Sequence, residues 1–239
     1  MLDPILDVLF PQENCCICRK PGRYGCKQPW CQQCTEEMTR LEKSGANCER
    51  CGKYLDSGQK LCEDCRQNPP EFEIARAVGP YEEPFRISTK VFKFMGRKYL
   101  AHKMGLMMAE KVKAEPGFGK IDLIVPVPIS PNSFLVRGFN QTDLLARHIG
   151  KELGVKVDNN VIFRVKDTPS QTELSKEERQ KNLLQAFEVR DEKKVLNKNI
   201  LLVDDVYTTG STGRECTRVL LNAGADRVCI ITWATGKGF

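Results

Sequence analysis

Downstream of residue 70, the chain alternates short apolar runs with longer amphipathic stretches. The apolar runs predict strands at residues 73–78, 121–127, 161–165, 200–203 and 228–233. Apolar positions at helical spacing predict helices at residues 88–114, 141–153, 175–187 and 212–222. Strands that alternate with helices in this way predict an α/β domain with a mostly parallel sheet covered by helices on both faces.

The first 70 residues have a different pattern, dominated by cysteine. Ten of the twelve cysteines of the 239-residue chain lie between Cys15 and Cys65. The polar, proline-bearing segment 66–71 follows the last of them and is typical of a domain junction. We therefore expect a cysteine-rich module over residues 1–70 and the α/β domain over residues 71–239.

Eight of these cysteines form four consecutive Cys-x-x-Cys pairs. Two intervening residues allow both sulfurs of a pair to face one tetrahedral ion, and each two-pair set has the spacing of a zinc ribbon. The predicted ligands of two structural Zn²⁺ ions are Cys15, Cys18, Cys31, Cys34, Cys48, Cys51, Cys62 and Cys65. Sequential pairing is the simplest arrangement, but an interleaved one is also open. Cys16 and Cys26 fit neither set, although Cys16 has the position to replace a neighbouring ligand.

Disulfides or redox-active dithiols are the alternatives to zinc. Disulfides fit poorly because the N-terminus has no basic region and carries Asp3 and Asp7, unlike a secretory signal. A thioredoxin-type dithiol requires a βαβ setting that this region lacks. No apolar run approaches the length of a membrane span, so we expect a cytoplasmic protein.

The net charge of +6 is weak evidence for a nucleic-acid partner. The first 70 residues contain ten basic and ten acidic side chains, so the whole excess lies in the α/β domain. Two four-thiolate zinc sites, each formally −2, would lower the total to about +2.

The most informative segment is residues 200–213, where an apolar strand leads into two aspartates and a turn rich in hydroxyl groups. Backbone amides, hydroxyl groups and a helix N-terminus suit a phosphate, and the predicted phosphate contacts are Thr208, Thr209, Gly210, Ser211 and Thr212. Asp204 and Asp205 are placed to accept hydrogen bonds from vicinal ribose hydroxyls. Neither a Walker motif nor a receiver domain has this arrangement. The segment therefore predicts a sugar-phosphate site.

This segment resembles the phosphoribosyl pyrophosphate motif of type I phosphoribosyltransferases, with Tyr207 where an aliphatic residue is more usual. Nearly the whole chain resembles the ComF (ComFC) family of competence-associated proteins. Besides the double cysteine ribbon, the matching segments are residues 92–97, 122–128, 137–141 and 168–175, followed by Arg179 and Asn182. The resemblance implies a type I phosphoribosyltransferase fold.

The resemblance also implies the remaining ligand contacts. Residues 125–130 would receive pyrophosphate, with the amides of Val127, Ile129 and Ser130 as donors because Pro126 and Pro128 have none. Arg137, Asn140 and Gln141 would lie on a mobile loop over the ligand, and further anion contacts would come from Lys93, Arg97 and Arg179. Mg²⁺ would bridge the ribose and pyrophosphate, while Asp204 and Asp205 would stabilise the charge that develops on the ring.

Three functions remain open from the sequence. The first is a ComF-like factor for DNA uptake and natural transformation, with single-stranded DNA and competence helicase and recombination proteins as partners. The second is an active phosphoribosyltransferase of nucleotide salvage with an unidentified acceptor. The third is a regulatory protein that senses the sugar phosphate without chemistry. The oligomeric state is also open.

Overall fold

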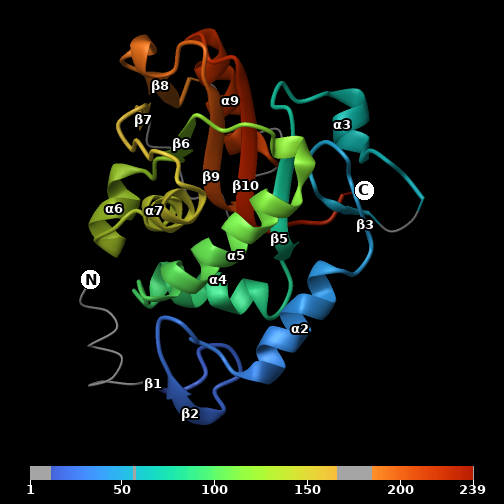
Figure 1. Ribbon diagram of the computed structural model, residues 1–239, viewed down its shortest axis with the longest axis vertical. Helices are drawn as coiled ribbons and strands as arrows, with labels where there is room; N and C mark the ends of the chain where they lie inside the picture. The colour runs from blue at the N-terminus through green and yellow to red at the C-terminus, as the bar shows by residue number, and fades with distance from the viewer. Residues whose placement is uncertain (1–11, 56–57, 166–184, 239) are drawn as a thin grey trace.

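A parallel four-stranded sheet forms the centre of the protein, seen here in a computed structural model that describes residues 12–55, 58–165 and 185–238 (Figure 1). Its strand order is β5-β10-β9-β6, and every neighbouring pair is parallel. The strands are β5 (Ala75–Pro80), β6 (Leu123–Pro126), β9 (Asn199–Tyr207) and β10 (Arg227–Thr235). The two central strands are almost entirely buried, as expected of a sheet covered on both faces.

Helices cover both faces of this sheet, which confirms the predicted α/β architecture. Leu201 and Val203 face a core with α4 (Phe85–Phe94), α5 (Leu100–Ala114) and α7 (Gln141–Leu153). The alternating residues Ile200 and Leu202 face a second core with α9 (Ser211–Asn222). Strand alternation therefore divides the apolar residues of β9 between two cores.

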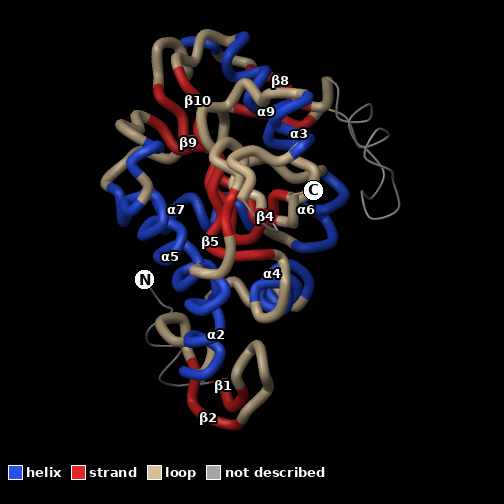
Figure 2. Tube along the Cα trace, turned by 90° about the vertical axis from the view of Figure 1, so that its right-hand side faces the viewer, coloured by secondary structure: helices blue, strands red, loops and turns tan. Residues whose placement is uncertain are grey.

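Each four-cysteine segment has the same local plan of two short strands followed by a helix. The first contains β1 (Gln12–Asn14), β2 (Pro21–Tyr24) and α2 (Gln32–Glu42), and the second contains β3 (Ala46–Asn47), β4 (Tyr54–Leu55) and α3 (Glu63–Gln67). Figures 1 and 2 show the β1–β2 hairpin at one end of the molecule, with α2 running from it toward the second segment. The helix α2 was not predicted, although Cys34, Met38 and Leu41 mark one buried helical face.

Several sequence-based boundaries were wrong. The helix expected at residues 88–114 is two helices, because Gly96 takes a left-handed φ of 63° between α4 and α5. The strand expected at residues 161–165 is β7 (Ile162–Arg164), which pairs with β8 (Phe187–Val189) outside the main sheet. Phe187 was expected to end a helix but begins β8, while residues 175–184 of that prediction lie outside the described residues.

Three short elements complete the described chain. The helix α6 (Pro131–Arg137) was not predicted, and two 3-10 turns lie at Pro116–Phe118 and Glu192–Lys194. No helix among the described residues is long and apolar enough to cross a membrane.

Candidate functional site

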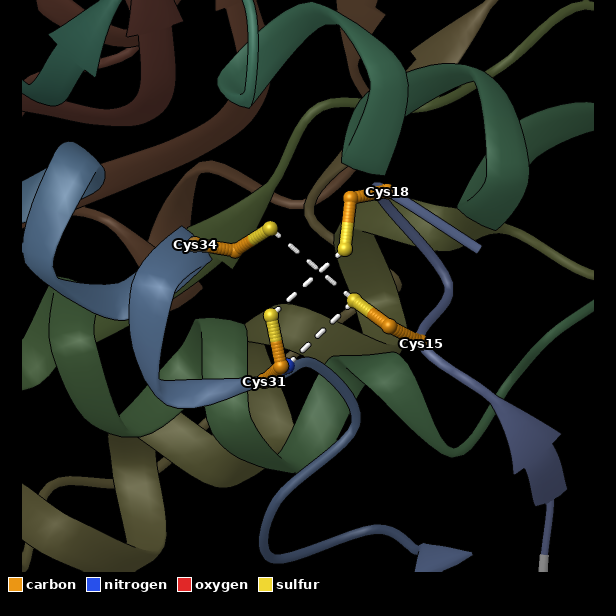
Figure 3. A group of neighbouring side chains, drawn as sticks. All are labelled: Cys15, Cys18, Cys31 and Cys34. Carbon is orange, nitrogen blue, oxygen red and sulfur yellow. Dashed lines mark hydrogen bonds between the residues drawn. The ribbon is translucent and has the colours of Figure 1, made fainter. Parts of the chain in front are cut away.

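The first four-cysteine site brings its four sulfurs together from two separate segments (Figure 3). The Sγ atoms of Cys18 and Cys31 lie 3.5 Å apart, and those of Cys15 and Cys34 lie 3.9 Å apart. The Cys31 amide also donates to Cys15 Sγ over 3.3 Å. Cys18 is exposed and Cys31 is half-buried, so one side of this site faces solvent.

The second four-cysteine site repeats this geometry in a buried setting. Cys51 and Cys62 have Sγ atoms 3.6 Å apart, and the Cys62 amide donates to Cys48 Sγ over 3.4 Å. All four residues, Cys65 included, have at most 3% of their surface exposed. The pairing is therefore sequential in both sites, and the interleaved alternative is excluded.

Both sites fit structural Zn²⁺. Sulfurs about 2.3 Å from one tetrahedral ion lie about 3.8 Å apart, close to the observed separations, whereas a disulfide requires about 2.05 Å. All cysteines described are free thiols. Cys16 and Cys26 belong to neither group, as expected, and burial followed by the charge of Cys15 raises the pKa of Cys16 to about 12.

The two aspartates of the candidate sugar-phosphate site lie at the carboxyl end of β9, on opposite faces of the strand. Asp205 follows Val203 toward α4 and α7, whereas Asp204 follows Leu202 toward α9 and acts electrostatically on Cys216. The Asp205 amide donates to Asp204 Oδ1 over 2.8 Å. Burial, followed by the charge of Asp205, raises the pKa of Asp204 to about 7.

Asp205 is held by side chains from two helices. Its Oδ1 atom lies 2.8 Å from Lys93 Nζ on α4, and its Oδ2 atom accepts a 2.8 Å hydrogen bond from Gln141 Nε2 on α7. Gln141 Oε1 in turn accepts from Arg137 at 3.0 Å, and the Arg137 guanidinium lies 5.4 Å from the centre of the Phe94 ring. Three of the predicted ligand contacts thus form one chain of contacts with Asp205.

The candidate phosphate loop, residues 208–212, connects β9 to α9. Gly210 has a left-handed φ of 83°, and its carbonyl accepts the Arg214 amide, which starts the helical ladder. Thr209 Oγ1 and Ser211 Oγ lie 2.9 Å apart. Thr208 is exposed at the tip. The loop therefore gathers hydroxyl groups at the N-terminus of a twelve-residue helix, where anions are favoured.

The segment expected to receive pyrophosphate follows β6 directly. The Val127 amide donates to the Val203 carbonyl over 2.9 Å, so its expected role as a pyrophosphate donor is corrected, because the sheet already uses it. Asn140 and Thr142 side chains both donate to the Val127 carbonyl. An open cavity of about 520 Å³ lies beside this segment, and Ile129 lines it.

The other predicted ligand contacts lie at helix ends or away from the acidic pair. Ser130 caps α6 through the Ser133 amide, Arg137 ends that helix, and Asn140 caps α7, so these residues flank and form two helices. Arg97 donates to Gln12 in the first ribbon over 2.7 Å and not to the acidic pair. Arg179 lies outside the described residues.

Sequence reasoning missed one basic residue at this site. Arg164, the last residue of β7, acts electrostatically on both Asp204 and Cys216, and its positive charge offsets a small part of the rise in pKa that burial causes in each. Its guanidinium lies 5.8 Å from the centre of the Phe187 ring. The sequence offered one indication of this role, because Arg164 lies near the end of the strand predicted at residues 161–165.

These features define a phosphoribosyl transferase-type α/β domain joined to a double zinc ribbon. Family models agree: the double zinc ribbon domain matches residues 5–66, and the phosphoribosyl transferase domain matches residues 107–237. The latter covers more than half of the chain.

Comparison with known proteins identifies the family. Competence protein F of Haemophilus influenzae is 30% identical over 217 residues, which cover 89% of this chain and 93% of that protein. DNA utilization protein YhgH of Escherichia coli K12 is 33% identical over 220 residues, covering 90% and 93%. The chain belongs to the ComF family. A solved glutamine phosphoribosylpyrophosphate amidotransferase from B. subtilis matches weakly, with 20% identity, a TM-score of 0.37 and coverage of 55% of this chain and 25% of that one.

Proposed function

We propose that the protein binds phosphoribosyl pyrophosphate with Mg²⁺ and uses this site in a ComF-like role in DNA uptake and natural transformation. The observation that carries the ligand proposal is the succession, within nine residues, of two aspartates, a hydroxyl-rich loop and a helix N-terminus. This succession offers acceptors for sugar hydroxyls directly beside donors for a phosphate.

In this proposal the two aspartates have different tasks. Both oxygens of Asp205 already have partners, so Asp205 fixes Lys93 and Gln141 relative to β9. Among the described residues, no hydrogen bond is made by Asp204 Oδ2, and we assign this oxygen to the ribose hydroxyls. Residues 208–212 would bind the 5-phosphate through hydroxyl groups and helix amides.

The pyrophosphate would lie beside residues 128–130, with the Ile129 and Ser130 amides as backbone donors. Arg137 ends α6 beside this segment and supplies the positive charge that pyrophosphate requires. Bound Mg²⁺ would neutralise the ligand oxygens between the two groups of donors. The adjoining cavity of about 520 Å³ provides room for a ligand group.

The biological role rests on the relatives and not on the geometry. Relatives named for competence and for DNA utilization align with about 90% of this chain. We therefore propose single-stranded DNA as a partner. Competence helicase and recombination proteins are further partners that the family resemblance implies, and we propose a cysteine-rich module over residues 1–70 as the docking unit. Deletion of the gene in a competent host should lower transformation by single-stranded DNA without causing nucleobase auxotrophy, and unchanged transformation would refute this role.

An active transferase is the second candidate function, and one observation favours it. Asp204 and Asp205 lie near the end of β9 directly before the candidate phosphate loop, where their carboxylates would stabilise positive charge that develops on a ribose ring. This function requires Mg²⁺-dependent release of pyrophosphate in the presence of an acceptor. A panel of nucleobases and other nucleophiles, read by pyrophosphate release, tests it directly.

The ligand proposal is tested by calorimetric titration of phosphoribosyl pyrophosphate and Mg²⁺ into the zinc-loaded protein. Wild type should bind, and Asp204→Asn should weaken binding by at least about tenfold, the equivalent of about 1.4 kcal/mol. Asp226→Asn is the matched control, because Asp226 is exposed beside the first residue of β10, at the opposite end of the sheet. Absence of binding by wild type would refute the proposal.

A further inference from the structure

Tyr207 connects the candidate phosphate loop to the second four-cysteine site. It is the last residue of β9, two positions beyond Asp205, and only 5% of its surface is exposed. Its ring lies in the core that also contains the four cysteines of the second site. Phe72 packs edge-on against it, with ring centres 6.2 Å apart and an interplanar angle of 86°. The ring therefore shares a core with the four cysteines of the second site and is packed against Phe72.

On the other side, the loop wraps closely around the Tyr207 ring. A Cβ atom added to Gly210 would lie 2.2 Å from Tyr207 Oη, and one added to Gly213 would lie 3.5 Å from Tyr207 Cε2. Only a glycine fits at position 210, since the backbone there is left-handed and in contact with the phenol. The conformation of the loop is thus shaped against this side chain.

The chain near the C-terminus makes a second connection between the same two regions. The Tyr207 carbonyl accepts the Gly236 amide over 2.9 Å and the Thr235 hydroxyl over 3.1 Å. Two residues later, the Gly238 amide donates to the Tyr54 carbonyl in the second ribbon over 2.8 Å. A Cβ atom on Gly238 would lie 2.8 Å from Cys62 Cβ. The tail therefore runs from the end of β9 directly onto the cysteine site.

We infer that Tyr207 is a positioning residue through which the second four-cysteine site holds the phosphate loop in the conformation that binds the sugar phosphate. The metal-binding ribbon is then part of the support of the ligand site. This inference rests on the proposed function for its ligand, but the coupling of ribbon and loop stands on the contacts alone.

The test compares Tyr207→Leu with Tyr207→Phe in the zinc-loaded full chain. Tyr207→Leu removes the surface on which Gly210 lies, so amide hydrogen exchange in residues 208–213 should rise by about tenfold or more. Affinity for phosphoribosyl pyrophosphate should fall by at least about tenfold, while two zinc ions per chain are retained. Tyr207→Phe keeps the ring and should restore both properties to near wild type.

Phe118→Leu is the matched control, because Phe118 is a fully buried aromatic residue in the other core, close to the start of β6. The inference is overturned if Tyr207→Leu changes loop exchange and affinity no more than Phe118→Leu does. If wild type binds no phosphoribosyl pyrophosphate, the proposed function fails, and the exchange experiment alone still decides the coupling.

If Tyr207→Leu does not fold, a second measurement tests the same inference without that variant. Cys18→Ser should release zinc from the first site and leave exchange in residues 208–213 unchanged. Removal of the second zinc from this variant by a chelator should then raise exchange in that loop before the sheet strands exchange. An equal rise after loss of the first zinc, or no rise after loss of the second, overturns the inference.

Discussion

The two four-cysteine sites share paired Cys-x-x-Cys motifs, two short strands and similar sulfur separations, yet they occupy different environments. The first has an exposed Cys18 and a half-buried Cys31, whereas all four cysteines of the second are buried. In the first, Trp30 packs against Trp233 of β10, with ring centres 6.1 Å apart, in the core that α4 and α5 cover. The cysteines of the second share a core with Tyr207, whose ring lies against Gly210 of the candidate phosphate loop. Similar metal motifs therefore support different parts of the α/β domain.

This difference shows that the position of a zinc ribbon in the fold determines what it stabilises. The first ribbon lies at one end of the molecule (Figure 2) and extends the core on one face of the sheet. The second is continuous with the core beneath the ligand loop. Its removal should affect ligand binding as well as stability.

The largest expected effect compares one cysteine from each site. Cys51→Ser should lose its zinc and lower the melting temperature by about 15 °C or more, because metal binding supplies much of the folding free energy of such small modules. Cys18→Ser should lower it by only about 5 °C. Elemental analysis and scanning calorimetry provide the measurement, and equal losses from the two variants would refute the distinction.

One buried aromatic residue from the core beside each ribbon forms the next comparison. Trp30→Ala and Phe72→Ala should each lower the free energy of unfolding by about 3–5 kcal/mol, since both rings are fully buried. Only Phe72→Ala should also weaken phosphoribosyl pyrophosphate binding, because Phe72 packs on Tyr207. Urea unfolding and calorimetric titration separate the two properties, with Trp30→Phe as the conservative control.

The pH dependence of stability tests whether the Asp204 carboxyl holds a proton in the folded protein. Its pKa is about 7 in the folded protein and near 3.8 when unfolded, so the folded state holds a proton that the unfolded state releases. Wild-type stability should therefore fall as pH rises toward and through 7. Asp204→Asn lacks this fall, so its stability relative to wild type should increase between pH 6 and pH 8.

Urea unfolding of wild type and Asp204→Asn over that range provides the measurement. Asp226→Asn should show a constant difference from wild type. A difference between Asp204→Asn and wild type that stays flat with pH would show that the carboxyl does not titrate near neutrality.

The smallest effect concerns Arg97, which the family resemblance suggested as an anion contact. Its hydrogen bond to Gln12 joins the first ribbon, so Arg97→Ala should cost about 1 kcal/mol of stability or less. Ligand affinity should stay unchanged, whereas Lys93→Ala should weaken binding because it leaves Asp205 without its ion pair. Calorimetric titration of both variants measures ligand affinity. Weaker binding by Arg97→Ala would show that Arg97 does contribute to the ligand site.

Features that depend on local spacing were accessible from the sequence. The Cys-x-x-Cys pairs predicted two zinc sites because two intervening residues bring both sulfurs to one ion. The apolar periodicity predicted α7 at its observed bounds and the alternation of strands and helices. The succession of Asp204, Asp205 and residues 208–212 predicted the chemistry of the candidate ligand site.

Other properties depend on which segments meet in space, and the sequence alone leaves these undetermined. No local pattern shows that Asp205 pairs with Lys93, that the sheet uses the Val127 amide, or that Arg97 turns to the first ribbon. The partners in these contacts lie from 76 to 112 positions apart in the chain, so folding of the whole domain sets their geometry. For the same reason, the sequence determined that there are two similar cysteine sites, and the tertiary structure decided that only the second underlies the phosphate loop.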